Sequence, residues 1–119
     1  INGRKKEKSV LSETDTLPKL LLEHARFRGD RPAYREKGLG IWQTWSWSET
    51  EKEIRNLCCG LKQLGFERGD KLAIIGDNRP CLYWAIMAAQ CLGGIPVPLY
   101  QDSVAQEMKY VLDNADIRF

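Results

Sequence analysis

The sequence predicts an α/β fold in which a mostly parallel sheet has flanking helices, follows an N-terminal β-hairpin, and is incomplete at its C-terminal edge. Three observations predict this fold. A hairpin pattern occupies residues 33–47, helical and strand patterns alternate after it, and residues 117–119 are typical of a strand that has only begun. Alternation at this spacing is typical of βαβ units, whose strands are parallel.

Residues 1–14 are polar, lack hydrophobic periodicity and include a basic run at residues 4–8. We expect a flexible basic leader here, with electrostatic attraction to an anionic membrane surface as the alternative. We expect one domain over residues 15–119. Its first helix is predicted by apolar residues at helical spacing, and Gly29 stands where that helix should end. The apolar residues are Leu17, Leu20, Leu21, Ala25 and, less regularly, Phe27.

Two strand patterns, at residues 33–36 and 41–47, flank a turn at residues 37–40 and predict an antiparallel hairpin. Trp42 and Trp45 fall on opposite faces of an ideal strand. The tryptophans of this hairpin either pack against the following helix or form a docking surface for a partner domain, because exposed aromatic residues are favoured at interfaces.

The clearest helix pattern follows the hairpin. We expect Ser48 to cap its first turn and Glu51 to complete a capping box. Gly65 should end this helix. One apolar stripe runs along it, made of Ile54, Leu57, Cys58, Leu61 and Leu64.

Strand and helix patterns alternate over the rest of the chain. Residues 71–75 predict a strand buried on both faces, and residues 81–92 a helix buried on most sides because it is apolar almost all round. Residues 95–99 contain two prolines and predict a short, edge-like strand. A last amphipathic helix should begin at Ser103 with Gln106 and end at residues 113–114.

The loop at residues 76–80 lies where open α/β sheets bind ligands, just after a parallel strand. It has one glycine and an adjacent acid, so it matches neither a dinucleotide-binding loop nor a P-loop. Either Asp77 or Asn78 caps the next helix with Arg79 solvated, or Arg79 contacts a ligand or an interface. Our candidate ligand or interface contacts are Asn78, Arg79 and Tyr100, and we assign no catalytic, cofactor-binding or metal-binding residue.

Composition excludes several classes of protein. A chain of 119 residues with 43% hydrophobic residues suits one domain, and a net charge of +2 is too small for a nucleic-acid binder. No run of about 20 apolar residues and no signal peptide is visible. We therefore expect a cytoplasmic protein, with a peripheral position at the inner face of the membrane as an alternative. The four cysteines, without a Cys-x-x-Cys pair, predict buried reduced thiols rather than a zinc site.

Six motifs in this order resemble the opening of adenylate-forming (AMP-binding) acyl-CoA synthetases, most of all bacterial long-chain fatty-acid–CoA ligases. The resemblance covers residues 15–119. The motifs are DTLPKLL, GDRPA, WQTWSW, LGFERGDKLAIIGDNRP, GGIPVPLYQDSV and YVLDNAD.

The resemblance implies a two-step reaction in the parent enzyme. With Mg²⁺, ATP and a fatty acid give an acyl-adenylate and pyrophosphate, and CoA then takes the acyl group as a thioester. The family's phosphate loop, its adenine- and ribose-binding motifs and its C-terminal lysine do not occur in these residues. We therefore expect the fragment to be inactive, to bind ATP, Mg²⁺ and CoA at most weakly, and to meet fatty acid, ATP and CoA only through the remainder of the enzyme.

Apolar faces left uncovered should make the fragment self-associate. Two other hypotheses stay open. One is a stand-alone protein-interaction module derived from such an enzyme, and the other is a flavodoxin-like nucleotide binder, which suits the order of strands and helices but has no phosphate loop.

Overall fold

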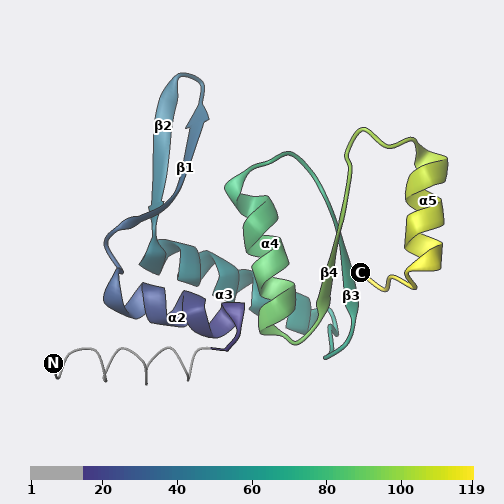
Figure 1. Cartoon of the computed structure of the whole chain (residues 1–119), viewed down its shortest axis with the longest axis horizontal. Coiled ribbons are helices and arrows are strands. Elements are labelled where there is room, and N and C mark those ends of the chain that lie inside the picture. The colour runs from purple at the N-terminus through teal and green to yellow at the C-terminus, as the bar shows by residue number, and fades with distance from the viewer. Residues whose placement is uncertain (1–14) are drawn as a thin grey trace, which may run out of the picture.

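A computed structural model describes residues 15–119, so the predicted leader at residues 1–14 lies outside the described residues. The α/β fold is confirmed (Figure 1). Its elements are α2 (Leu17–Phe27), β1 (Pro32–Gly38), β2 (Ile41–Ser46), α3 (Trp47–Gln63), β3 (Lys71–Ile75), α4 (Pro80–Cys91), β4 (Ile95–Leu99) and α5 (Ala105–Asn114). Among the described helices, none combines the length and the apolar character needed to cross a bilayer.

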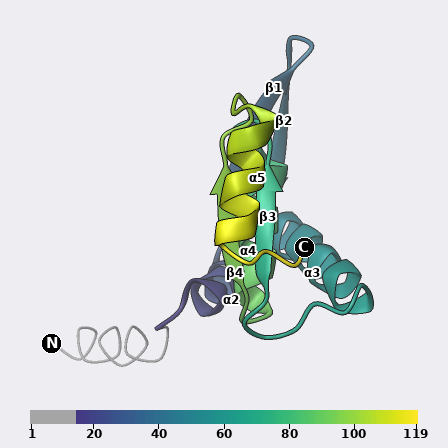
Figure 2. The same cartoon turned by 90° about the vertical axis from the view of Figure 1, so that its right-hand side faces the viewer.

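Strands β3 and β4 pair in parallel, from Lys71 opposite Ile95 to Ile75 opposite Leu99, and α4 is the crossover between them. Helix α4 lies on one side of this pair and α5 on the other (Figures 1 and 2). The parallel arrangement is therefore observed for two strands, with helices on both sides, as expected for a βαβ unit.

Phe119 lies beside β3 on the edge opposite to β4. Its N–H donates to the carbonyl oxygen of Lys71 (3.3 Å), and its own carbonyl oxygen accepts from the N–H of Ala73 (2.8 Å). These two bonds are the pattern of a parallel strand placed opposite Leu72. Along a strand, alternate residues form hydrogen bonds with the neighbouring strands on opposite sides. Phe119 bonds to Lys71 and Ala73, whereas β4 bonds to the alternate residues, as shown by the N–H of Ile95, which donates to the carbonyl oxygen of Asp70 (2.8 Å). Of the strand expected at residues 117–119, Phe119 is thus the residue that pairs with β3.

The antiparallel hairpin is also present, with a tighter turn than the expected one at residues 37–40. Gly38 pairs with Ile41, which leaves a loop of Leu39 and Gly40. Both loop residues have positive φ, 50° and 80°, as in the type I′ turn that suits the twist of two paired strands.

The expected start of α3 was wrong by two residues. The capping box is formed by Ser46 and Glu49, because the N–H of Glu49 donates to Ser46 Oγ (3.1 Å) and the N–H of Ser46 donates to Glu49 Oε2 (2.8 Å). Trp47 is therefore helical rather than the last hairpin residue. Its N–H donates to the carbonyl of Arg31 (3.0 Å), which fixes where the strand turns into the helix.

The predicted start of α5 was wrong by one residue, because a different residue caps the helix. Val104, not Ser103, is the N-cap residue of α5. Its N–H donates to the carboxylate of Glu107 (3.3 Å), so the acid that satisfies the first turn is Glu107 rather than the expected Gln106. The predicted end at residues 113–114 is confirmed.

The core is centred on four buried side chains from α2, α3 and α4. Tyr34 and Trp45 of the hairpin pack against it, and the Trp45 ring meets the Trp84 ring edge-on at 5.5 Å. Trp45 therefore follows the packing alternative, while Trp42 stays exposed. The buried side chains are Leu21, Ile54, Trp84 and Ala88.

Burial of β3 and α4 is less complete than their composition suggested. Ile74 is the buried residue of β3, whereas the neighbouring Ile75 is exposed. Tyr83 of α4 is also exposed, although the helix is apolar almost all round. A pair of strands covers much less of a helix than a wide sheet would, and apolar side chains on both elements therefore face solvent.

The expectation of buried thiols is correct in part. Cys59, Cys81 and Cys91 are exposed, and only Cys58 packs against the core. Burial, together with the nearby Cys91 thiol, raises the pKa of the Cys58 thiol to about 11. Its Sγ donates to the carbonyl of Ala88 (3.6 Å), which also favours the protonated form. Cys58 is thus an inert packing residue at neutral pH.

Alkylation with iodoacetamide at pH 8 tests this assignment. The thiolate is the reacting species, so we expect Cys58 to react at least about tenfold more slowly than its exposed neighbour Cys59. Mass spectrometry of the alkylated peptides measures both rates. The rate at Cys58 should keep rising as the pH approaches its raised pKa of about 11. Equal rates at pH 8 in the folded chain would show that the Cys58 thiol is not protected.

A second prediction concerns the close approach of Gly94 to Phe66. A Cβ at Gly94 would lie 2.4 Å from Phe66 Cζ and 2.8 Å from the carbonyl oxygen of Asp70. We expect Gly94→Ala to lower the free energy of unfolding by about 1–3 kcal/mol, because Phe66 is buried and cannot move away freely. Urea unfolding followed by circular dichroism measures the change.

Gly60→Ala is the matched control. Gly60 lies within α3, and a Cβ there would meet nothing within 4 Å. Alanine should raise the free energy of unfolding by about 0.5–1 kcal/mol, because glycine weakens a helix interior. A Gly94→Ala variant as stable as the parent chain would refute the proposed crowding.

Candidate functional site

The loop between β3 and α4 forms a hollow of about 530 Å³ at the carboxyl end of β3. Parallel strands place such loops at one edge of the sheet, where α/β proteins usually bind ligands. The hollow is lined by Ile74, Ile75, Gly76, Asp77, Arg79, Cys81, Leu82 and Ala85.

Arg79 is held by two carboxylates. Its Nε lies 3.4 Å from Oε1 of Glu36 on β1 and 3.8 Å from Oδ2 of Asp77 in its own loop. The side chain remains 62% exposed, so the Glu36 pair contributes at most about 1 kcal/mol to stability. One guanidinium between two carboxylates leaves this group of three with a net negative charge, which disfavours a free anion as its ligand.

The helix start in this loop differs from the expected one. Neither Asp77 nor Asn78 caps α4; the N-cap residue is Arg79, whose side chain makes no capping hydrogen bond. Pro80 is the first helical residue, as expected, and it restricts the residue before it to extended backbone. The side-chain oxygen of Asn78 is used instead by the Tyr83 hydroxyl, which donates to it.

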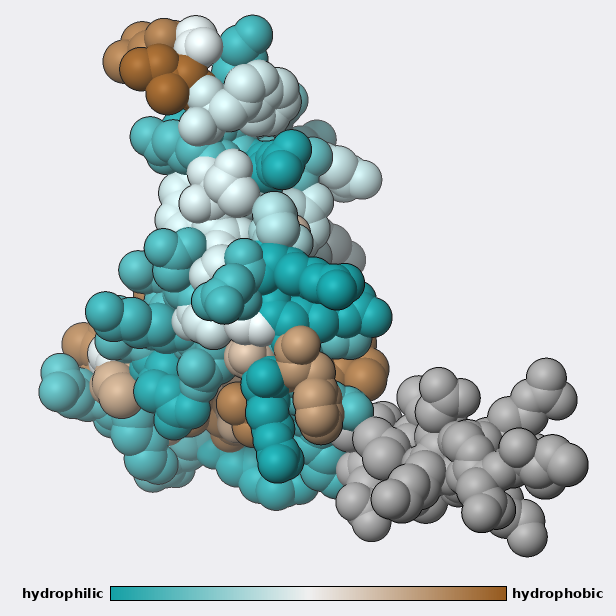
Figure 3. Space-filling model, turned by 90° about the vertical axis from the view of Figure 1, so that its left-hand side faces the viewer, coloured by the Kyte–Doolittle hydropathy of each residue, from teal (hydrophilic) through white to brown (hydrophobic). Residues whose placement is uncertain are grey.

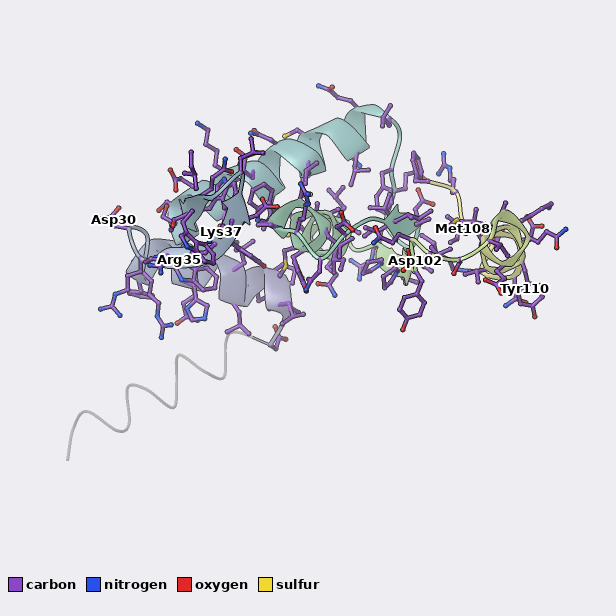
Figure 4. The ribbon with its side chains drawn as sticks, turned by 90° about the horizontal axis from the view of Figure 1, so that it is seen from above. Asp30, Arg35, Lys37, Asp102, Met108 and Tyr110 are labelled. Carbon is purple, nitrogen blue, oxygen red and sulfur yellow. The ribbon has the colours of Figure 1, made fainter. Side chains whose placement is uncertain are left out.

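Tyr100 follows β4 at the same edge of the sheet, because Ile75 pairs with Leu99. It is exposed and is not among the residues that line the hollow. The structure therefore gathers Asn78 and Arg79 in one loop and leaves Tyr100 on the neighbouring one. Figure 4 shows this loop region from above, with Asp102 labelled just beyond Tyr100 in the chain.

Glu36 and Tyr83 are parts of this site that sequence reasoning missed. Glu36 comes from the hairpin, and no spacing rule connects it with Arg79 across the intervening β2, α3 and β3. Tyr83 stands five residues after Asn78, a separation at which no helical pairing rule applies across the helix start. Burial, and secondarily the Tyr83 hydroxyl, raises the pKa of the nearby Tyr34 phenol. Tyr34 is thus neutral at physiological pH.

Neither a metal site nor the single histidine contributes to this loop within the described residues 15–119. No group of three or more His, Cys, Asp or Glu side chains in this part of the chain could hold a metal ion. His24 lies on α2, and its ring packs at 4.8 Å from the Trp47 ring, away from the loop after β3. The loop itself offers ion pairs and hydrogen bonds, without a base beside a nucleophile.

Comparison with known proteins identifies the family. The family model of the AMP-binding enzyme matches residues 21–119. The long-chain-fatty-acid–CoA ligase FadD15 of Mycobacterium tuberculosis is 30% identical over 109 residues, which are 90% of this chain and 18% of that protein. The chain therefore spans about a fifth of the length of this relative. An uncharacterized protein of the same species, Rv1549, is 29% identical over 113 residues, which are 95% of this chain and 63% of that one.

Solved structures agree on the fold. The N-terminal subdomain of NpsA from Klebsiella oxytoca superposes with a TM-score of 0.77 at 24% identity, over 86% of this chain and 26% of that chain. A fatty acid AMP ligase from Legionella pneumophila superposes with a TM-score of 0.78 at 14% identity, over 86% of this chain and 18% of that chain. The family match, which covers residues 21–119, shows that the chain belongs to the AMP-binding enzyme family.

Proposed function

We propose that residues 15–119 are the first α/β portion of an acyl-CoA ligase that activates a long-chain fatty acid with ATP. The observation that carries this proposal is the family match over residues 21–119. The substrate class follows relatives such as FadD15, a long-chain-fatty-acid–CoA ligase of which the chain covers 18%. In the whole enzyme, ATP and the fatty acid would give an acyl-adenylate and pyrophosphate, and the CoA thiol would then displace AMP to form the thioester.

Within residues 15–119, the described side chains do not fit ATP or Mg²⁺. Arg79, the cation of the loop after β3, is flanked by Glu36 and Asp77. No group of acids suited to a metal ion occurs in this part of the chain. We therefore derive no catalytic step from these residues, and we propose that ATP, Mg²⁺ and CoA are bound by other parts of the enzyme.

The role that we propose for this portion is positioning. The Arg79–Glu36 pair connects the start of α4 with the hairpin, and the Tyr83 hydroxyl bond holds Asn78 in the same loop. Tyr100 on the neighbouring loop offers a free hydroxyl and an exposed ring. We propose that Asn78, Arg79 and Tyr100 contact either a ligand or another part of the enzyme at this edge of the sheet.

Exchange of pyrophosphate into ATP tests the assignment of chemistry. We expect the 119-residue chain, with palmitate and Mg²⁺, to give no exchange above background, because its described residues contain neither a phosphate loop nor a group of side chains that could hold a metal ion. Intact FadD15 serves as the positive control. Exchange that scales with the amount of pure chain would contradict the proposed division of labour.

A chimera provides the positive arm of the same test. The segment of FadD15 that matches this chain is replaced by the chain's own residues. We expect a folded chimera to form palmitoyl-CoA, because the two segments share a family fold. A chimera that folds and binds ATP but forms no palmitoyl-CoA would argue against the proposed substrate class.

A stand-alone interaction module is the second candidate function. The similarity to Rv1549 favours an interaction module, because the match covers 63% of Rv1549 and 95% of this chain. Exposed apolar residues on the parallel strands, such as Ile75 and Ile95, would then meet a partner.

For both candidates we propose that the 119-residue chain self-associates. Light scattering on a size-exclusion column should show dimers or larger species whose fraction increases with concentration, because association covers the exposed apolar side chains. Ile75→Lys should shift the distribution toward monomer. A monodisperse monomer over the whole soluble range of concentration would rule out this association.

A further inference from the structure

The tip of the hairpin, defined here as residues 37–42, stands clear of the rest of the molecule (Figure 1). Figure 3 shows hydrophobic atoms at its apex, above a mostly hydrophilic surface. Leu39 is fully exposed, and Ile41 and Trp42 are 68% and 63% exposed. Three large apolar side chains in four consecutive positions are thus presented to solvent at the end of the hairpin that points away from the core.

Leu39 has no folding reason to occupy the apex. Its φ of 50° lies in the left-handed region, where glycine, asparagine and aspartate are tolerated and other side chains are strained. The first position of this kind of two-residue loop strongly favours asparagine. Leucine at this position is strained without any packing contact in return, since its side chain is fully exposed.

The apolar apex is followed by a basic collar. Arg35 and Lys37 lie on β1 two residues apart, so they share a face of the hairpin with Trp42, the partner of Lys37. Lys37 Nζ lies 5.9 Å from the centroid of the Trp42 ring. Figure 4, which looks down on the hairpin, labels both basic residues there. The acid between them, Glu36, faces the other way and is paired with Arg79.

Counterions for the collar are missing within the described part of the chain. Neither Arg35 nor Lys37 forms an ion pair with an acid of residues 15–119. The face that carries Trp42 is therefore positively charged. An anionic partner would complement it.

We propose that the hairpin tip docks on an anionic lipid bilayer. Leu39 and Ile41 enter the boundary of the acyl chains, Trp42 lies at the level of the headgroups, and Lys37 and Arg35 contact anionic headgroups. This order along the hairpin matches the layers of a bilayer surface, in which aromatic residues prefer the interface and basic residues the charged headgroup region. The inference is independent of the proposed ligase activity.

A lipid surface fits the tip better than a protein partner does. Stable protein interfaces bury roughly 800 Å² on each side, which a two-residue turn with its flanking pair cannot offer. A fluid bilayer accepts a narrow wedge. The hairpin is also anchored at its base, where Tyr34 and Trp45 pack on Trp84, so the tip is presented at a defined position.

Sedimentation of the 119-residue chain with lipid vesicles tests the proposal. The probes are vesicles of phosphatidylcholine alone and of phosphatidylcholine with about 30% phosphatidylglycerol. We expect binding to the anionic vesicles that weakens as salt is added. Leu39→Asn should reduce the partition coefficient by about fivefold or more, because it removes the apolar apex, and should leave the melting temperature equal or higher, because asparagine suits the turn.

Leu64→Asn is the matched control. Leu64 is 72% exposed, lies at the end of α3 far from the hairpin in the sequence, and has an ordinary φ of −76°. The Leu64→Asn variant should therefore bind vesicles as tightly as the parent chain does. Loss of binding by both variants, or by neither, would overturn the proposal, as would a parent chain that fails to bind anionic vesicles.

Quenching by brominated lipids locates the contact. Trp42 is the exposed tryptophan of the hairpin, whereas Trp45 and Trp84 pack in the core. We expect brominated lipids to quench the tryptophan fluorescence of the bound chain. The Trp42→Phe variant should lose most of this quenching, whereas a variant with Lys5→Gln and Lys6→Gln should keep it. Binding that depends on the leader lysines and shows no quenching would overturn the proposal. So would a Leu39→Asn variant that loses self-association while vesicle binding is unaffected, because the tip would then be a protein contact.

Discussion

The packing around the Trp84 indole is the interaction on which the rest of the structure depends. Trp84 lies in the middle of α4, where the ring of Trp45 meets it edge-on at 5.5 Å and that of Tyr34 at 6.3 Å. Each such pair contributes about 0.5–1.5 kcal/mol beyond the area it buries. The helices α2 and α3 supply Leu21 and Ile54 to the same cluster. Trp84 thus joins the hairpin to the helical layer, and α4, which carries it, also packs against β3 and β4. This packing connects two sheets that are otherwise separate, each with two strands.

This arrangement also determines the position of the loop after β3. Since Trp84 fixes α4 against the hairpin, the start of α4 lies next to β1, and Arg79 reaches Glu36. The ion pair is therefore a consequence of the aromatic packing rather than its cause, because an exposed pair of this kind contributes little by itself. Because this packing fixes α4, it also fixes the loop at the start of α4. A fixed loop can hold a ligand or another part of the enzyme in position, which is the role that we propose for it.

Local patterns predicted most of the elements, because hydrophobic periodicity and turn residues lie within a few positions of one another. The start of α3 could not be predicted, since Ser46 with Glu49 and Ser48 with Glu51 both have capping-box spacing. The choice between them depends on the bond from Trp47 to the carbonyl of Arg31, a tertiary contact. The Arg79–Glu36 pair escaped prediction for the same reason. Exposure of β3 and α4 was misjudged because composition does not reveal how many strands cover a helix.

Within residues 15–119, two residues other than glycine have positive φ, and the reasons for their conformations differ. Asp116, with a φ of 53°, belongs to a residue type that tolerates the left-handed region, and it precedes the segment that brings Phe119 to β3. The left-handed conformation of Asp116 therefore contributes to the pairing of Phe119 with β3. Leu39 has the same conformation without such a contact. A sequence that follows local rules nearly everywhere and departs from them at a fully exposed apex indicates a requirement from outside the folded chain, because foldability alone would favour asparagine there.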